Sequence, residues 1–111
     1  MARKPKKKRK LASLLMQESC LRMSGPVAFT GELILTQEDL RFVPTRKFER
    51  LLGAKKVRIP VADIREVSVV QFGKKLEVQT ERGLQSFLGE GACSVGARLW
   101  ALVLERDGKE A

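Results

Sequence analysis

The sequence predicts a mainly β protein, in which an antiparallel meander of short strands is followed by one long helix. Apolar and polar residues alternate in several short runs, such as residues 40–43 and 76–79, which is the period of a half-buried strand. Compact turn signals at residues 24–26 and 73–75 separate such runs, so consecutive strands are expected to pair as hairpins. The helical pattern, residues 92–106, comes after all of them.

The first element has two interpretations. Leu11, Leu14 and Leu15 have the i, i+3, i+4 spacing of a short helix, whereas residues 20–23 alternate weakly, as the start of a strand would. Beyond the turn at residues 24–26 the pattern is extended. Strands are expected over residues 27–36, 40–43, 57–60, 65–72, 76–79 and 84–88, with a polar turn at 37–39.

The expected helix has an apolar face that would cap the sheet. Its side chains follow i, i+4, i+7, i+8 spacing, and Trp100 and Leu104 lie on an adjoining stripe. We expect this second stripe to close the end of the sheet as well, and a seam with a second copy of the chain is the alternative. The residues of the first face are Val95, Leu99, Leu102 and Val103.

Several small signatures recur in order along residues 27–105: Gly-x-apolar-x-apolar-Thr, then apolar-x-Phe, then Ile-Pro-apolar-x-x-Ile, then a glycine turn, a Phe and a Trp-bearing helix. They are carried by Gly31, Leu33, Leu35, Thr36, Leu40, Phe42, Ile59, Pro60, Val61, Ile64, residues 79–83, Phe87 and Trp100. In this combination the chain resembles the GRAM branch of the pleckstrin-homology-like superfold. The resemblance implies a bent antiparallel sheet, or partly open barrel, of about seven strands capped by the C-terminal helix. It also implies lipid or protein binding rather than catalysis.

Positive charge is concentrated in two places. The formal net charge is +9, yet residues 1–10 hold seven Lys/Arg and no acid, and residues 41–58 hold seven more beside one acid, Glu49. The rest of the chain has 8 basic and 12 acidic residues. The charge therefore favours a negatively charged partner at two local patches rather than over the whole surface.

The N-terminal patch contains nothing to bury, so residues 1–10 are expected to be a disordered tail ahead of a single domain at residues 11–111. Residues 4–10, KPKKKRK, resemble a monopartite nuclear localisation signal, which has meaning only in a eukaryotic host. The alternative is a solvated electrostatic arm. The candidate anion-binding residues of the tail are Lys4, Lys6, Lys7, Lys8, Arg9 and Lys10.

Residue types that catalysis needs are scarce. The chain has no histidine, so the usual general base near neutral pH is missing. Cys20 and Cys93 without histidine make neither a zinc site nor a Cys–His nucleophile pair. The carboxylates at residues 38–39 and 63–66 fall in a turn and a strand lead-in, where ordinary polar surface is expected. We therefore expect a binding module, not an enzyme, with no metal and no cofactor.

The two cysteines and the apolar runs bear on location. Two cysteines far apart indicate free thiols in a reducing compartment. Apolar runs stay well short of the ~20 residues of a membrane span, and residues 11–16 are shorter than an export core. A cytoplasmic protein, peripheral at a membrane, is the expectation.

The second patch contains the candidate binding loop, residues 45–56. On a helical turn Phe48, Leu51 and Leu52 share one small apolar face, and five cations surround them. Such a face suits the headgroup boundary of an anionic bilayer, and the alternative is that it packs the hairpin back onto the sheet. The candidate site residues are Arg46, Lys47, Phe48, Arg50, Leu51, Leu52, Lys55 and Lys56.

Three classes of partner remain at this point, ranked as an anionic membrane lipid surface, a protein, and nucleic acid. The membrane ranks first because cations and apolar residues are interleaved in one loop. Strand addition at a sheet edge, or a helix seam, would serve a protein partner. Single-stranded nucleic acid needs aromatic platforms, and of five Phe only Phe48 is expected to be free. The four Phe expected at core positions are Phe29, Phe42, Phe72 and Phe87.

Overall fold

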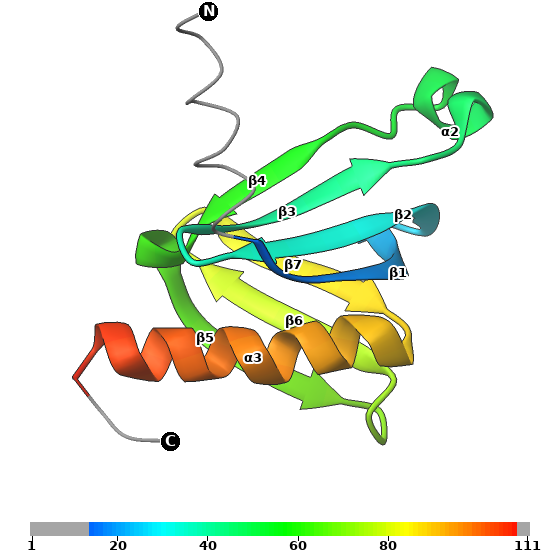
Figure 1. Ribbon diagram of the computed structural model, residues 1–111. Coiled ribbons are helices and arrows are strands. Elements are labelled where there is room, and N and C mark those ends of the chain that lie inside the picture. Colours follow the sequence, from blue (N-terminus) through cyan, green and yellow to red (C-terminus); the bar gives the residue numbers. More distant parts are fainter. Residues whose placement is uncertain (1–13, 109–111) are drawn as a thin grey trace, which may run out of the picture.

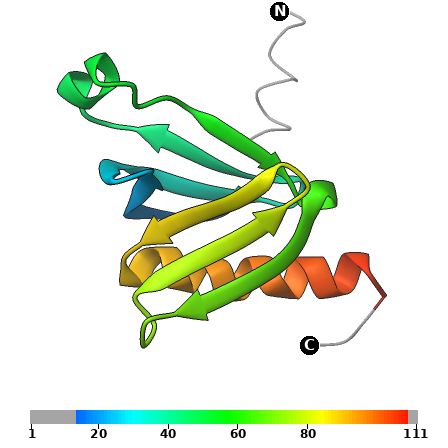
Figure 2. The same ribbon diagram turned by 180° about the vertical axis from the view of Figure 1, so that it is seen from behind.

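The computed structural model describes residues 14–108, so the tail of residues 1–10 lies outside it. Seven strands form one antiparallel sheet in the order β4-β3-β2-β1-β7-β6-β5. The sheet bends until its two halves face each other, and the long helix α3 lies across the opening between them (Figures 1 and 2). The elements are β1 (Leu14–Ser24), β2 (Val27–Thr36), β3 (Asp39–Pro44), α2 (Lys47–Leu51), β4 (Val57–Pro60), η1 (Val61–Asp63), β5 (Ile64–Val70), β6 (Lys75–Thr80), β7 (Gly83–Leu88) and α3 (Glu90–Arg106).

The predicted meander and its closing helix are confirmed. Consecutive strands pair as antiparallel hairpins on both sides of the β4–β5 corner, as the compact turns indicate. One pairing the sequence does not reveal joins the two halves: Leu21 on β1 lies opposite Leu88 on β7. This pairing makes β1 the shared strand, and it leaves β4 and β5 as the two edges.

The starts of β1 and α3 differ from the prediction. The chain is extended from Leu14, so the helical interpretation of Leu14 and Leu15 is wrong, because pairing with β2 overrides the local spacing. The helix α3 begins at Glu90, two residues before the predicted start at residue 92, so Gly91 lies in its first turn. A Cβ at Gly91 would lie 2.9 Å from the Cβ of Glu18, so its role is close packing of α3 on β1.

The core lies between the bent sheet and α3. The rings of Phe42 and Phe87 face each other across the two halves with centroids 6.1 Å apart. Gly31 lies under the Phe42 ring, where any Cβ would collide with that ring and with the carbonyl of Val43. From α3 the buried side chains are Ala92, Val95, Leu99 and Val103, with Leu102 partly buried beside them.

Trp100 and Leu104 do not belong to this core. Trp100 is exposed and Leu104 only partly buried, so the expectation that this stripe also closes the sheet is wrong. The stripe lies one helical step away from the face that packs on β1 and β5. A seam with a second copy stays an untested prediction.

A buried carboxylate locks the β2–β3 turn. Asp39 is fully buried, and it accepts hydrogen bonds from Thr36 Oγ1 at 2.8 Å, Arg41 Nε at 3.0 Å and Arg58 Nε at 2.6 Å. Burial by itself would raise the pKa of Asp39, but the hydrogen bonds from Arg41, Thr36 and Arg58 hold that pKa below its ordinary value of 3.8. The prediction that Asp39 is ordinary polar surface is therefore wrong, because it ties β3 to β4 through Arg58.

Replacing Asp39 with Asn is expected to lower the free energy of unfolding near pH 7 by about 1.5–3 kcal/mol, since two arginines lose their charged acceptor. Because the folded pKa is depressed, the stability that Asp39 contributes is complete above 3.8 and is lost as the pH falls through the folded value. Urea unfolding measures the free energy of unfolding of wild type and of Asp39→Asn. The difference between the two should therefore shrink at pH values below the folded pKa of Asp39. A difference that stays constant into strong acid would contradict this account.

Replacing Phe42 with Ala is expected to lower the free energy of unfolding by about 3–5 kcal/mol, because the ring fills the space above Gly31 and against Phe87. The matched control is Gln79→Ala on the exposed face of β6, where a change within about 0.5 kcal/mol is expected. Urea unfolding followed by circular dichroism measures both. A Phe42→Ala protein that unfolds at the wild-type urea concentration would refute the packing described.

Candidate functional site

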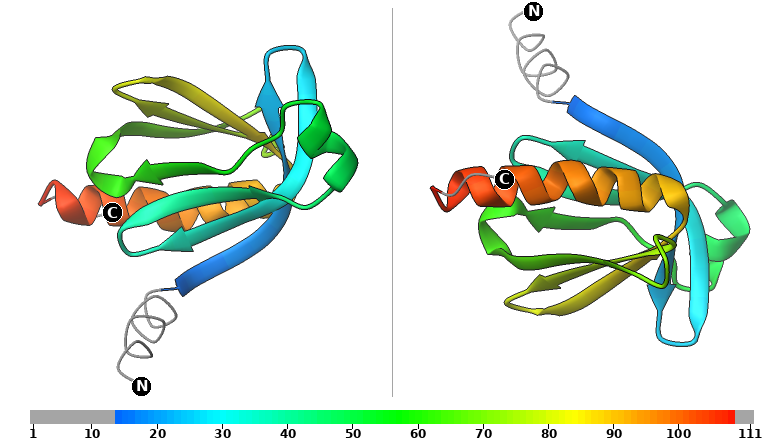
Figure 3. Two further views of the ribbon diagram at one scale, coloured as in Figure 1. Left: turned by 90° about the horizontal axis from the view of Figure 1, so that it is seen from above. Right: turned by 90° about the horizontal axis from the view of Figure 1, so that it is seen from below.

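The candidate loop carries the short helix α2 and projects from one end of the bent sheet. Three turns meet at this end: the β1–β2 turn, the α2 loop and the β5–β6 turn, all at the right of Figure 1. The pairing register agrees, since Ser24 lies opposite Val27 and Lys75 lies opposite Leu88, whose partner on β1 is Leu21. Seen from above, α2 extends beyond the strands (Figure 3).

Polar side chains of α2 fasten the helix to the sheet. The Glu49 carboxylate accepts a hydrogen bond from the backbone N–H of Thr30 at 2.6 Å. The Arg50 guanidinium donates to the carbonyl oxygen of Pro44 at 2.8 Å. The buried Ala54 donates its backbone N–H to the carbonyl oxygen of Glu49 at 3.0 Å, which closes the loop behind the helix.

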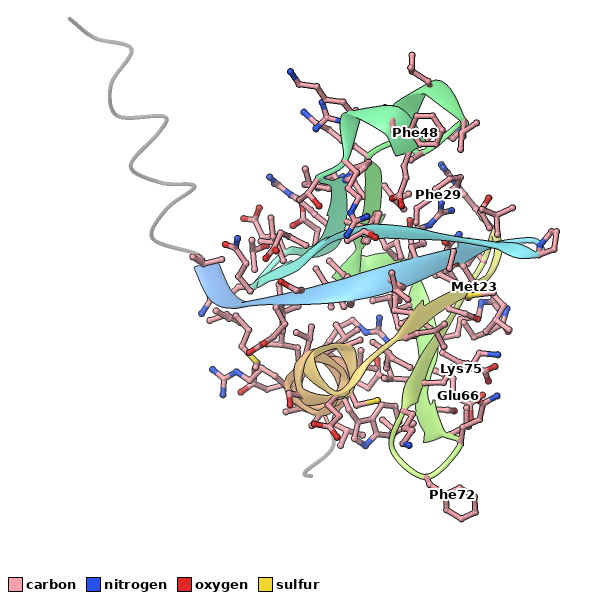
Figure 4. The ribbon with its side chains drawn as sticks, turned by 90° about the vertical axis from the view of Figure 1, so that its right-hand side faces the viewer. Met23, Phe29, Phe48, Glu66, Phe72 and Lys75 are labelled. Atoms are coloured by element: carbon pink, nitrogen blue, oxygen red, sulfur yellow. The ribbon has the colours of Figure 1, made fainter. Side chains whose placement is uncertain are left out.

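The apolar side chains of the loop point the other way. Phe48 is 69% exposed, Leu51 84% and Leu52 60%, and no residue of α2 is buried. Figure 4 shows Phe48 on α2 at the margin of this end of the molecule. The alternative that these three residues pack the hairpin onto the sheet is therefore wrong. The polar residues of α2, not its apolar residues, hold the helix in place.

The exposed charge of the loop is positive. Arg46, Lys47, Lys55 and Lys56 are exposed and make no ion pair with any residue in the range 14–108. The loop's one acid, Glu49, is turned toward Thr30. The predicted site residues are thus brought together as three apolar side chains among cations, while Arg50 is engaged with Pro44.

This end of the molecule has two exposed apolar tips, the group on the α2 loop and a second one that the sequence did not predict. Phe72 is fully exposed at the β5–β6 turn, so its prediction as a core residue is wrong. Gln71 and Phe72 both have positive φ, at 55° and 59°, and with Gly73 at 82° they make the chain leave β5 after Val70. Such φ values cost roughly 1–2 kcal/mol for a residue with a side chain. Gly73 indicates a turn in the sequence, but it does not indicate how many residues before it the strand ends.

Figure 4 looks onto this end and shows how the two tips are arranged. Phe48 and Phe72 lie at opposite margins, and Met23 and Phe29 lie between them. Lys74 is exposed beside Phe72, whereas Lys75 pairs with Glu77 at 3.5 Å. The two apolar tips are therefore separate features of one end of the molecule.

The β1–β2 turn between the tips is short and uncharged. Ser24 pairs with Val27, so only Gly25 and Pro26 form the turn, as their sequence predicts. A turn of this kind offers no lysines to enclose a phosphorylated head group. Along β3 and the start of β4, a hollow of about 420 Å³ is lined by Arg41, Phe42, Val43, Lys56, Val57 and Arg58, but Arg41 and Arg58 are held by Asp39.

The two cysteine thiols are not placed for nucleophilic chemistry. Burial raises the pKa of the Cys20 thiol to about 12, and the negative charge of Glu32 adds to this rise, so the thiol stays protonated and weakly nucleophilic. Cys93 is partly buried, and both cysteines are free.

Among residues 14–108 no cluster of three or more His, Cys, Asp or Glu is placed to hold a metal ion. Within the same range no helix is both long and apolar enough to cross a bilayer.

The N-terminal patch, the predicted tail with Lys4, Lys6, Lys7, Lys8, Arg9 and Lys10, lies outside the described residues. Its point of attachment is defined, however, because Leu14 pairs with Thr36 beside the β2–β3 turn. That turn is at the opposite end of β1 from the β1–β2 turn and α2. The two basic segments thus join the domain at opposite ends.

No family model and no curated protein matches the sequence. Solved structures do match. The C-terminal domain of an unknown protein from Leishmania infantum is 24% identical, with 88% of this chain and 93% of that chain covered and a TM-score of 0.61. The N-terminal PH domain of human ARAP2 is 15% identical, with 82% and 80% covered and a TM-score of 0.64.

These likenesses, with the seven-stranded bent sheet and the C-terminal helix, show a pleckstrin-homology-like fold. The predicted fold class is confirmed. A fold by itself does not specify a function, so the partner of this chain has to be argued from its own surface.

Proposed function

We propose that this chain is a non-catalytic module of the GRAM branch that binds anionic membrane lipid peripherally through the α2 loop. One observation carries the proposal: Phe48, Leu51 and Leu52 are exposed together among cations that have no acidic partner within residues 14–108. The signature residues around Gly31 and Ile59 support the GRAM branch. Two free thiols support a reducing, cytoplasmic location at the membrane surface.

The physics of the loop suits the headgroup boundary. Phe48, Leu51 and Leu52 would leave water on entering the acyl region, and a fully buried side chain of this size gains about 1.5–3 kcal/mol. Each nearby Lys or Arg adds about 1 kcal/mol at an anionic surface. Because Glu49 is bonded to Thr30, it does not face the lipid phosphates. Binding would be weakly selective for head group, since no lysine-lined pocket encloses one.

Phe72 supports the same orientation. It lies on the β5–β6 turn at the end that carries α2, and Lys74 is exposed beside it. A broad, flat bilayer can meet both tips at once, whereas a small ligand held between them cannot. The positive φ values of Gln71 and Phe72 turn the chain away from β5, and the Phe72 ring is fully exposed.

A protein partner is the second candidate. The free edges of β4 and β5 can accept an added strand, and exposed Trp100 offers a helix seam. Both lie on elements other than α2, so a protein partner at either place would not need the exposed Phe48 group. Nucleic acid ranks third, because the exposed aromatics Phe48, Phe72 and Trp100 lie on three different elements and form no continuous stacking platform.

Replacing Phe48, Leu51 and Leu52 together with Ser is expected to leave the fold intact and to weaken binding to phosphatidylserine-containing vesicles at least tenfold. The three side chains are exposed, so circular dichroism and the urea midpoint should not change. Co-sedimentation with vesicles measures the binding. The matched control is Leu84→Ser, an exposed leucine near the opposite end, next to the β6–β7 turn. A folded triple variant that binds as wild type would move the contact elsewhere.

Replacing Phe72 with Asn is expected to leave the free energy of unfolding unchanged or to raise it by up to about 1 kcal/mol, since Asn tolerates a left-handed φ better than Phe. Binding to the same vesicles should fall severalfold. Urea unfolding and co-sedimentation measure the two effects. A loss of several kcal/mol, as expected for Phe42→Ala, would mean that Phe72 packs in the core.

A further inference from the structure

A shallow groove lies at the end of the molecule away from α2. Its volume is about 590 Å³, and it is lined by the β2–β3 turn, η1 and the last turns of α3. The β2–β3 hairpin separates this groove from α2, because Pro44 pairs with Gly31 whereas the β2–β3 turn follows the pair of Leu35 and Leu40. In Figure 1 α3 ends at the left and α2 lies at the upper right. A chain therefore cannot place its own α2 in its own groove.

The groove combines apolar side chains with negative charge. Val61 and Ala62 of η1 and Leu102 of α3 supply the apolar part. Glu38 comes from the β2–β3 turn and Glu105 from α3, and both are exposed. Neither carboxylate makes an ion pair with any residue in the range 14–108. A partner in this groove would meet apolar contact and two carboxylates at once.

Arg106, a cation that also lines the groove, is turned toward the protein. Its guanidinium donates hydrogen bonds to the carbonyl oxygens of Val61 and Ile64, the latter at 2.8 Å. It also pairs with the Asp107 carboxylate at 2.8 Å, which offsets its charge. The groove therefore has a net negative charge, which comes from Glu38 and Glu105.

The loop at the other end has the complementary chemistry. We call the α2 tip the three exposed apolar side chains of the loop together with its exposed cations: Phe48, Leu51, Leu52, Arg46, Lys47, Lys55 and Lys56. The tip extends beyond the strands (Figure 3), whereas the groove is hollowed. Tip and groove thus match in shape, in apolar surface and in the sign of their charge, and such complementarity favours one specific contact.

We infer that the α2 tip of one copy docks in the groove of a second copy, so that chains associate head to tail in solution. Two tips in contact would bring cations together, and two grooves would bring carboxylates together, and both arrangements are disfavoured by repulsion. The favoured contact is therefore heterologous, and heterologous contacts build a ring or an open chain of copies. The inference goes beyond the proposed function, because a bilayer and a second copy compete for the same tip.

The contact is small, since a helix of five residues enters a single groove. Interfaces below about 1,200 Å² are typical of weak, transient association, so the experiment covers micromolar to millimolar protein. Sedimentation velocity of the full chain without lipid measures the average mass. For the wild type this mass is expected to rise with protein concentration and to pass that of a dimer.

Two variants remove one side of the contact each. The groove variant is Glu38→Lys with Glu105→Lys, and the tip variant is Phe48→Ser with Leu51→Ser and Leu52→Ser. Each is expected to weaken association about tenfold or more. All five side chains are exposed, so circular dichroism and the urea midpoint should not change. If the charge reversal prevents folding, Glu38→Gln with Glu105→Gln removes the charge alone and should weaken association as well.

The matched control makes the same change in net charge outside the groove. It is Glu66→Lys with Glu90→Lys, two exposed acids on β5 and at the start of α3. This control should associate like the wild type. Association weakened as much as in the groove variant would assign the effect to net charge and overturn the inference.

A mixture of the groove variant and the tip variant is the sharpest test. The groove variant keeps a working tip and the tip variant keeps a working groove, so one contact can form between them. The mixture should therefore give a 1:1 dimer and nothing larger, although neither variant associates by itself. A mixture without this dimer overturns the inference, as does wild type that stays monomeric at millimolar concentration.

Vesicles separate the inference from the proposed function. The groove variant should co-sediment with phosphatidylserine-containing vesicles at least as well as the wild type, because its tip is unchanged. Such vesicles should also dissolve the wild-type assembly. Vesicles that bind the wild type and leave the assembly intact overturn the inference alone, since the tip cannot meet both partners. An assembly that forms in a chain that does not bind vesicles overturns the proposed function alone.

Discussion

The hydrogen bond from the Thr30 backbone N–H to Glu49 orients the whole candidate site. This 2.6 Å contact, with the 2.8 Å bond from Arg50 to Pro44, holds α2 by its polar side chains. Because those side chains face the sheet, Phe48, Leu51 and Leu52 are left in water. A short amphipathic helix would ordinarily pack its apolar face inward. Here the polarity is inverted, and an exposed apolar group of this kind is typical of an interaction surface.

The orientation of α2 also separates the charges of the loop, with its acid toward the sheet and its exposed cations outward. Glu49 would repel an anionic surface if it faced outward, but it is bonded to the sheet, so the outer surface carries cations and apolar groups. Farther along the hairpin, Asp39 forms ion pairs with Arg41 and Arg58, so these two cations stabilise the pairing of β3 with β4. The basic segment of residues 41–58 therefore divides into arginines that hold the hairpin together and cations that are free to meet a partner.

The bent sheet gives these surfaces their relative positions. An antiparallel meander puts alternate turns at the same end, which brings the β1–β2 turn, the α2 loop and the β5–β6 turn together. The same alternation puts the start of β1 at the other end, beside the β2–β3 turn. The packing of Phe42 on Phe87 and of α3 on the sheet keeps this arrangement rigid.

Apolar periodicity and turn residues determined the hairpins, the closing helix and the place of the candidate loop, because these depend on neighbours a few residues apart. The start of β1 was not determined in this way, since Leu14 and Leu15 are extended only by pairing with β2. Nor was the burial of Asp39, which Arg58 reaches from 19 residues away, or the exposure of Phe72, which follows from where β5 ends. The direction in which α2 faces was decided by Glu49 meeting Thr30, a contact across 19 residues. Tertiary structure decided these points because burial is a property of what lies opposite a side chain, and local sequence does not say what that is.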